Sequence, residues 1–303
     1  MEKTFETLLQ TVVVVGSANL DLVVYTSRTP EPGETLIGDR FEEHPGGKGL
    51  NQAIASARQA STFFVGAIRK DGAGRTLGDA LERARVGITH LELVDGASGV
   101  AVINVVSGGE NSITVIPGAN DEVTAEAARM ALDTMRPRAV VTQLEVPLDT
   151  VAAAAAWAQD HGARWIFNPS PLGRFTEAPA DHPIRQLLST ANPLIVNADE
   201  GRGVLGPDTW GADRSIEEVA IELSALATSV VVTDGPRGAY VGDREELTFL
   251  PAESVQAIDT TGAGDAFAGT LAARLVHGHS LLDSARHAGA AAAAVVATAR
   301  VDR

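Results

Sequence analysis

The 303-residue chain contains no cysteine, and this absence removes several kinds of chemistry at once. It excludes disulfide bonds, thiolate nucleophiles and zinc sites built on cysteine. Long apolar runs are also missing. The opening MEKTFETLLQ is acidic, and HAGAAAAAVVATA near the end is too short and too weakly apolar to span a bilayer. We therefore expect a cytoplasmic protein with neither a secretion signal nor a membrane partner.

Positive charge is scarce as well. The chain has 24 Lys and Arg against 39 Asp and Glu, which gives a formal net charge of −15. Such a protein repels the phosphates of nucleic acids and of anionic membranes, so neither is an expected partner. An anionic substrate such as ATP then needs Mg²⁺ or locally placed positive groups. Lysine is the rarer basic residue, which draws attention to Lys48 inside GGKG.

Several familiar catalytic patterns are absent. There is no Walker A sequence, because Gly49 stands where a Ser or Thr that binds Mg²⁺ would follow Lys48. HExxH, GxSxG and EF-hand patterns are also missing, and the seven histidines are scattered along the chain. The glycine-rich stretches and the strand ends are therefore the places to look for chemistry.

Apolar runs and helical segments alternate along most of the chain. TVVVVGS (11–17) is typical of a buried parallel strand, and NQAIASARQA (51–60) of a helix. By the same criteria, further strands are predicted near 62–68, 139–145, 163–170, 192–200 and 229–235, and further helices near 75–86, 122–135, 149–161, 183–190, 215–227, 263–277 and 281–298. This alternation indicates an α/β fold: a doubly wound, mostly parallel sheet with helices on both faces.

Two segments break this alternation. Residues 23–45 have strand-like pieces and turns but no helix, and SGGE within 97–118 separates two apolar runs, which predicts a hairpin. Together they predict a small β-sheet lid over the edge of the main sheet where ligands bind in α/β folds. We expect the α/β core to comprise 1–22, 46–96 and 119–303, with 23–45 and 97–118 forming the lid.

Polar side chains or glycines stand at the predicted carboxyl ends of five strands. They are Asn19 with Asp21, Glu145, the stretch 168–170, Asn197 with Glu200, and the stretch 233–238. Any one of them has a simple structural explanation, such as an Asx turn. Because the ends of parallel strands share one edge of a sheet, the whole set predicts a ligand site along that edge.

Two glycine-rich stretches open helices. PGGKGLNQA supplies glycine amides followed by Lys48 and Asn51, although a loop with an Asn cap is the plain alternative. DTTGAGDAFAGT (259–270) places Asp265 in the first turn of its helix. The local explanation is a tight turn and an acid that suits the helix dipole. The chemical explanation is an anion site made by bare amides, with a general base beside it.

The pair GGKGLNQA and DTTGAGDAFAGT resembles the two signatures of the ribokinase (PfkB-type) carbohydrate kinase family. GSANLD, PGET, the Glu145 strand end, NADE and TDGPRG occur in family order, so the resemblance covers nearly the whole chain. N-x-D at 19–21, GGKGxNQA at 46–53 and Glu145 are most similar to the members that phosphorylate ribose. The resemblance implies MgATP-dependent conversion of D-ribose to ribose 5-phosphate, and a homodimer joined through the lid.

The resemblance also implies roles for matching positions. The general base is Asp265, and the anion hole is formed by the amides of Gly262, Ala263 and Gly264. The sugar-binding positions are Asn19, Asp21, Gly47, Lys48, Gly49, Asn51 and Glu145. The nucleotide-binding positions are Asn197, Thr233, Asp234, Gly235, Pro236, Arg237 and Gly238. The metal positions are Glu200 for Mg²⁺, and Asp259 with Thr261 at the start of a K⁺ site.

The end of the sequence departs from the family pattern. Family members continue beyond TARVDR with further cation ligands and a loop beside the adenine, so we expect a weakened K⁺ site. We also expect Arg300 to lie near Asp259 and partly replace the cation.

Two alternatives to ribose phosphorylation stay open. One is a family kinase acting on a nucleoside, on fructose or on a keto-deoxy sugar. The lid has only Tyr25 and Phe41 as aromatic residues, which favours a bare sugar over a nucleoside. The other is a sugar-binding pseudokinase without activity.

Overall fold

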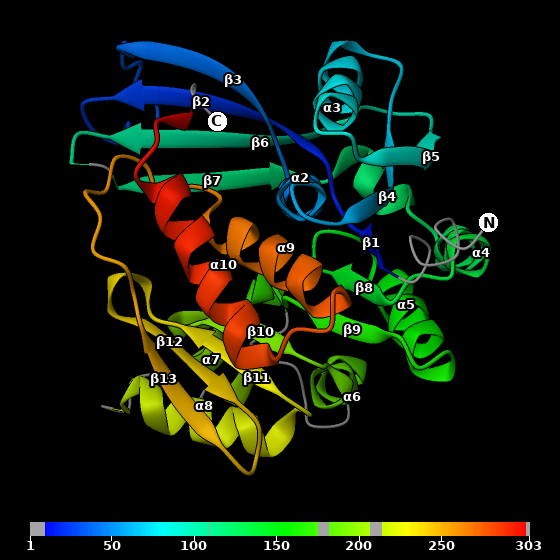
Figure 1. The fold of residues 1–303 in the computed structure, drawn as a ribbon. Helices are drawn as coiled ribbons and strands as arrows, with labels where there is room; N and C mark the ends of the chain where they lie inside the picture. The colour runs from blue at the N-terminus through cyan, green and yellow to red at the C-terminus, as the bar shows by residue number, and fades with distance from the viewer. Residues whose placement is uncertain (1–9, 109, 175–181, 207–213, 301–303) are drawn as a thin grey trace.

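The main sheet runs through the centre of the protein in a computed structural model that describes residues 10–108, 110–174, 182–206 and 214–300 (Figure 1). Within these residues it has nine strands in the order β13-β12-β11-β10-β9-β8-β1-β4-β5. Their bounds are β1 Thr11–Val15, β4 Ser61–Ile68, β5 Gly87–Leu93, β8 Ala139–Thr142, β9 Arg164–Phe167, β10 Leu194–Asn197, β11 Val230–Thr233, β12 Gly238–Gly242 and β13 Leu247–Pro251. The pairings of β12 with β11 and with β13 are antiparallel, whereas the other pairings in this sheet are parallel. The prediction of a mostly parallel sheet is confirmed.

Helices cover both faces of this sheet, as predicted (Figure 1). One face packs against α2 (Lys48–Ala57), α3 (Gly72–Arg83), α9 (Ala263–Val276) and α10 (Leu281–Val296). The other packs against α4 (Ala125–Met135), α5 (Leu148–Asp160), α6 (Pro183–Thr190), α7 (Ala198–Leu205) and α8 (Ile216–Leu226). The three short 3₁₀ turns among the described residues are η1 (Gly118–Glu122), η2 (Leu172–Arg174) and η4 (Gly235–Arg237). None of the helices in the described ranges is long and apolar enough to cross a membrane.

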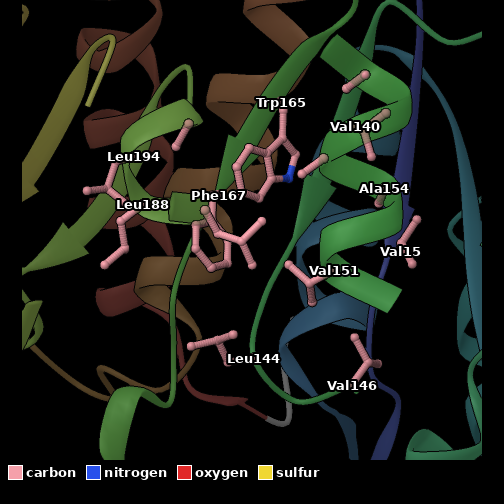
Figure 2. Close-up of a cluster of buried hydrophobic side chains, with 14 of the residues drawn as sticks. Val15, Val140, Leu144, Val146, Val151, Ala154, Trp165, Phe167, Leu188 and Leu194 are labelled. Atoms are coloured by element: carbon pink, nitrogen blue, oxygen red, sulfur yellow. The ribbon is translucent and has the colours of Figure 1, made fainter. Parts of the chain in front are cut away.

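The buried valines of β1 explain why this strand is continuously apolar. Val13 and Val15 point into the core layer on the α4–α8 side, while Val12 and Val14 point into the layer shared with α2 and α9. Figure 2 shows Val15 in the first layer, near Val140, Val151 and Ala154. Because side chains alternate between the two faces of a strand, a central strand covered on both sides needs apolar residues at every position.

A second, smaller sheet lies beyond the edge of the main sheet (Figure 1). It comprises β3 (Arg40–Gly46), β2 (Asn19–Thr26), β6 (Gly99–Val106) and β7 (Asn111–Ile116), in that order. The predicted hairpin is present as the antiparallel pair β6–β7, whereas β2 and β6 run parallel. The division of the chain into core and lid ranges remains a proposal.

One local prediction was wrong. Asn19 and Asp21 were expected at the carboxyl end of the first strand, but they belong to the first residues of β2 in the small sheet. The chain leaves β1 at Val15 and enters the small sheet after only three residues, so the two side chains are presented by the lid strand itself.

The carboxyl ends of five neighbouring strands share one edge of the main sheet. In spatial order these strands are β11, β10, β9, β8 and β1, and all of them run parallel. Except for Asn19 and Asp21, the polar residues predicted at strand ends therefore stand along this edge. Four elements were not predicted from the sequence. They are strand β5, the two strands of the hairpin β12–β13, and helix α7 directly after β10.

Helices α2 and α9 approach each other unusually closely, and a glycine makes this possible. A Cβ atom at Gly269 of α9 would lie 2.2 Å from the Gln52 carbonyl oxygen and 2.8 Å from the Ala55 Cβ of α2. Both distances are shorter than atoms in contact allow. Any larger residue at this position therefore has to push the two helices apart.

We expect Gly269→Ala to destabilise the protein by about 1–3 kcal/mol, because it overpacks the contact between the two helices. Gly289→Ala is the matched control, since Gly289 lies inside α10 and a Cβ there meets no atom within 4 Å. The control should be neutral or slightly stabilising. Urea unfolding followed by circular dichroism measures both, and equal stability of the two variants would contradict the role given to Gly269.

Candidate active site

Asp265 is buried in the first turn of α9, at the edge where the strands end. The helix starts after Gly262, whose positive φ of 76° forms a left-handed turn that favours glycine. Both carboxylate oxygens of Asp265 accept hydrogen bonds from α2: Oδ2 from Asn51 Nδ2 at 3.1 Å, and Oδ1 from Gln52 Nε2 at 3.0 Å. The carboxylate is thus held in one orientation by two adjacent amides.

The surroundings of Asp265 raise its pKa above the usual value for an aspartate. Burial is the main cause, because it disfavours the charged form. The Lys48 ammonium and the donors on Gln52 and Asn51 oppose this effect, while the Glu145 carboxylate adds to it. A carboxyl group whose pKa is raised toward neutrality is suited to accept a proton during a reaction.

Open backbone amides lie beside this carboxylate at the start of α9. The anion hole was predicted from the amides of Gly262, Ala263 and Gly264, but the Ala263 N–H already donates to the Thr260 carbonyl at 3.2 Å. Among the described residues, the N–H groups of Gly264 and Asp265 have no acceptor. A Cβ atom at Gly264 would meet no atom within 4 Å, so the space in front of it is open. Free amides at a helix start attract anions.

Lys48 brings a positive charge to the same place. It is the first residue of α2 and follows Gly47, whose φ of 89° turns the chain into the helix. Burial lowers the pKa of the Lys48 ammonium, but the carboxylates of Asp265, Glu145 and Glu200 outweigh this effect and raise it above its usual value. The ammonium is therefore charged at neutral pH.

Glu145 lies next to the same helix start. Its Oε2 atom accepts hydrogen bonds from the Ser17 hydroxyl and, at 3.0 Å, from the Lys48 N–H. The Ser17 oxygen in turn accepts from the Gly49 N–H at 3.3 Å. Gly49 itself is a close-contact position, because a Cβ there would lie 2.5 Å from the Ser17 nitrogen. These contacts anchor α2 to the end of β1.

Asp21 points toward this cluster from the small sheet and pairs with Arg300. The ion pair joins the Arg300 guanidinium to Asp21 Oδ2, and both side chains are largely buried. Burial raises the pKa of the Asp21 carboxyl despite the opposing charge of Arg300. The expectation that Arg300 neutralises Asp259 is therefore wrong, because the last described turn lies beside β2 (Figure 1).

Asn19 is held by a residue outside the predicted set. Its Oδ1 atom accepts from Asn120 Nδ2 at 2.7 Å, and Asn120 Oδ1 accepts from the Ala18 N–H at 2.9 Å. Asn120 lies in η1, where the chain returns from β7 to the core. Its buried amide therefore links two of the connections between the small sheet and the core, the one before β2 and the one after β7.

The predicted nucleotide residues surround a separate hollow of about 320 Å³. Asn197 at the end of β10 and Thr233 at the end of β11 lie side by side on neighbouring parallel strands. Both line this hollow together with the stretch 234–237. Of the predicted nucleotide set, Gly238 alone is not among its lining residues. Arg237 forms two 2.6 Å hydrogen bonds to the Asp234 carboxylate, which orders this loop.

Asn197 and Glu200 also have a local structural role. They form a capping box for α7, in which Asn197 Oδ1 accepts from the Glu200 N–H at 2.8 Å and Glu200 Oε2 accepts from the Asn197 N–H at 3.0 Å. This arrangement satisfies the helix start without a ligand. It also holds the Glu200 carboxylate within electrostatic range of Lys48.

Asp259 and Thr261 lie in the loop before α9. Asp259 Oδ1 accepts from the Thr261 N–H at 2.8 Å, and the Asp259 N–H donates to the Val296 carbonyl at the end of α10 at 3.2 Å. The loop that leads to the free amides is thus attached to the last helix.

A larger hollow of about 520 Å³ contains no predicted site residue. It is lined by Arg138, Arg164 and Asn192 among others, at the opposite edge of the sheet where β8, β9 and β10 begin. The candidate site is therefore not this larger hollow but the place where Asp265, Lys48, Glu145 and Asp21 converge.

Sequence reasoning missed several polar residues of the site. They are Ser17, Gln52, Asn120 and Gln143, and Asn168 was noted only as part of a strand end. Gln52 lies inside the GGKGLNQA motif, directly after Asn51, so its position next to a predicted ligand was an available signal. The other missed residues lie 91 to 128 residues away in the sequence from the side chains that they contact.

Comparison with known proteins is consistent with this geometry. Residues 9–302 match the model of the pfkB family carbohydrate kinases. The chain is similar to the ribokinase of Haemophilus influenzae, with 31% identity over 95% of this chain and 92% of the relative. It is similar to the deoxyribokinase of Salmonella typhi, with 34% identity over 86% of this chain and 84% of the relative. The solved structure of Arabidopsis thaliana ribokinase with ribose and ATP superposes with a TM-score of 0.80 at 28% identity, covering 95% and 93% of the two chains.

Gly264→Ala tests whether the amides at the start of α9 bind a transferred group. Its Cβ enters open space, so the free energy of unfolding should stay the same or rise slightly. If an anion approaches the Gly264 and Asp265 amides, the methyl group obstructs it, and kcat/KM for ATP-dependent turnover should fall about 10-fold or more. Gly289→Ala serves as the control for helix propensity. Unchanged turnover in Gly264→Ala would place the anion elsewhere.

Proposed function

The chain belongs to the pfkB family of carbohydrate kinases, and we propose that it transfers the γ-phosphoryl group of ATP to the hydroxymethyl oxygen of D-ribose. The observation that supports this proposal most is the position of Asp265. A buried carboxylate with a raised pKa stands beside free amides at one helix start. Phosphoryl transfer requires these two elements, a base for the incoming hydroxyl and donors for the phosphoryl oxygens.

The proposed reaction uses the residues of this helix start directly. Asp265 accepts the proton of the sugar hydroxyl as its oxygen bonds to the γ-phosphorus, and the bond from that phosphorus to the bridging oxygen of ADP breaks. The N–H groups of Gly264 and Asp265 donate to the equatorial oxygens of the phosphoryl group. The Lys48 ammonium balances the negative charge that collects between the two substrates.

The proposed sugar site lies between the small sheet and the start of α2. Asp21 and Glu145 carboxylates suit a polyol, since each oxygen can accept from a sugar hydroxyl. The remaining residues of the site are Asn19, Gly47, Lys48, Gly49 and Asn51. The Arg300 guanidinium neighbours the Asp21 carboxylate, so a sugar that binds Asp21 either displaces Arg300 or shares the carboxylate with it.

The proposed nucleotide site is the hollow beside Asn197 and the stretch 233–238. Magnesium is usually bound by one or two carboxylates together with phosphates and water, and it does not need a cage of protein ligands. Among the described residues, no group of three or more His, Cys, Asp and Glu side chains could hold a metal ion. We propose a site that Glu200 forms jointly with ATP, with the Glu200 Oε2 atom fixed by the capping box. Mg²⁺ bound there would neutralise charge on the phosphates.

We also propose that Asp259 and Thr261 begin a site for a monovalent cation such as K⁺. Carboxylate and carbonyl oxygens before α9 have the hard-ligand chemistry that such ions require. Because this loop leads directly to Gly262, an ion there would order the amides of the phosphoryl site.

The proposed partner of this chain is a second copy, bound through the small sheet. The face of this sheet that carries Asp21 also carries Ala101 and Ile103, and their strand partners Val115 and Ile113 are 37% and 53% exposed. Contiguous exposed apolar side chains of this kind mark interaction surfaces. Pairing of two such faces would bury them and cover the sugar site.

The substrate proposal is tested with a coupled ADP assay on ribose, 2-deoxyribose, fructose and adenosine. We expect the highest kcat/KM with ribose. Asp265→Asn should lower kcat by roughly 10²–10⁴, the usual loss on removing a positioned general base. Calorimetric binding of ribose and ATP should change much less.

Each other result corrects a defined part of the proposal. Higher kcat/KM with 2-deoxyribose or adenosine would reassign the substrate within the family. Binding of ribose without turnover of any sugar would identify a pseudokinase. Near-normal kcat in Asp265→Asn would remove the base assignment.

Ile113→Asp should convert the dimer to a monomer, because it places a charge in the proposed interface. Val102→Asp is the matched control, since Val102 is 39% exposed on the neighbouring strand but points to the opposite face of the small sheet. Sedimentation velocity distinguishes the two states. A monomeric parent protein, or dissociation caused only by Val102→Asp, would contradict the assigned interface.

A further inference from the structure

A chain of buried side-chain amides runs through the interior to Asp265. Gln143 Nε2 donates to Gln52 Oε1 at 2.6 Å, and Gln52 Nε2 donates to Asp265 Oδ1 at 3.0 Å. Gln52 Nε2 also donates to Asn168 Oδ1 at 3.2 Å, and Asn168 Nδ2 donates to the Ile195 carbonyl at 3.0 Å. This series of hydrogen-bonded amides connects the ends of β8 and β9, helix α2 and strand β10 to the start of α9.

The direction of every hydrogen bond in this chain follows from one backbone group. The Ile195 carbonyl can only accept, so the NH₂ group of Asn168 must face it and the Asn168 oxygen must face Gln52. Gln52 therefore presents its NH₂ group to Asn168 and Asp265, and its oxygen to Gln143. The side chain next to the proposed base is thereby fixed as a donor.

This order leaves one atom without a partner. The Gln52 and Gln143 side chains are both fully buried, and Gln143 Oε1 accepts no hydrogen bond from any residue that the structure describes. Space for it exists only because residue 16 is glycine, since a Cβ at Gly16 would lie 2.1 Å from this oxygen. A buried unpaired carbonyl costs free energy, so packing alone does not explain the presence of two glutamines here.

We propose that Gln52 and Gln143 are positioning residues that orient the Asp265 carboxylate and favour its ionised, proton-accepting form. Gln52 acts on Asp265 directly, and Gln143 acts through Gln52 by holding its amide with the NH₂ group toward the base. The inference rests on the proposed function, in which Asp265 is the general base.

The charges around Asp265 set the direction of the effect. Lys48 of α2 and the amides of Asn51 and Gln52 favour the ionised carboxylate, while burial and the Glu145 carboxylate beyond β8 favour the protonated form. Removing the donor on Gln52 therefore raises the pKa of Asp265. A base works only when ionised, so activity that falls on acidification should begin to fall at a higher pH.

The first experiment compares the pH profiles of kcat/KM for the parent protein, Gln52→Met, Gln143→Met and the double variant. A hydrogen bond to a charged group corresponds to a shift of about 1 to 2 pH units, which we expect for Gln52→Met. Gln143→Met should cause a smaller shift in the same direction. In the Gln52→Met background, the Gln143 substitution should add no further shift.

Ser56→Ala is the matched control. Ser56 is buried on the same helix and hydrogen-bonded to Thr62 at 2.9 Å, but it faces β4 rather than Asp265. Ser56→Ala should lower the free energy of unfolding without changing the pH at which kcat/KM falls on acidification. An equal shift in Ser56→Ala, or additive shifts in the double variant, would overturn the proposal.

The second experiment requires no substrate. Carbon-13 NMR of labelled aspartate carboxyls, with the Asp265 signal identified by its loss in Asp265→Asn, gives the pKa of this group directly. An unchanged pKa in Gln52→Met would overturn the inference. A raised pKa in a protein that phosphorylates no sugar would support the amide chain and refute the proposed function. If Gln52→Met does not fold, Gln52→Asn, which shortens the amide away from Asp265, provides the same test.

Discussion

The contact between α2 and α9 determines the geometry of the candidate site. Gly269 lets the two helices lie so close that no Cβ fits between them. Only at this separation do Asn51 and Gln52 reach the Asp265 carboxylate, which is more than 200 residues away in the sequence. The start of α2 also carries Lys48 and is anchored by Glu145. The packing of a single pair of helices therefore positions the Asp265 carboxylate, the Lys48 ammonium and the Glu145 carboxylate, which are the proposed base, the proposed charge-balancing group and a proposed sugar ligand.

Charge balance explains how an acidic protein can gather several carboxylates at one place. Asp265, Glu145 and Glu200 all act on the Lys48 ammonium, and Asp21 is partnered by Arg300. Each carboxylate is thus near a positive group, which offsets the cost of removing it from water. Of the two positive groups, Lys48 lies at the start of α2 and Arg300 lies beside β2 of the small sheet.

The sequence was sufficient for the parts of the structure that depend on local pattern. Apolar runs such as 11–15 identify central strands because both faces of the sheet are covered. Four of the five predicted polar strand ends then follow from the shared direction of the parallel strands. Helix α7 (Ala198–Leu205) was missed because its first residues were assigned to the preceding strand, which was predicted to extend to residue 200. The amide chain and the Arg300–Asp21 pair depend on contacts across 90 to 280 residues, which no local spacing encodes. Asn19 and Asp21 were assigned to the end of the first strand because only three residues separate β1 from β2, and no turn pattern in the sequence marks where β2 begins.

The link between β1 and β2 has a mechanical consequence. Only residues 16–18 separate Val15 of β1 from Asn19, the first residue of β2. The Ala18 N–H donates a hydrogen bond to Asn120 Oδ1, which lies in η1 after the small sheet. A connection this short restricts how far the small sheet can move relative to β1. Ser17, whose hydroxyl donates to the Glu145 carboxylate, lies in the middle of it. A tilt of the small sheet would therefore displace the hydroxyl that supports the Glu145 carboxylate.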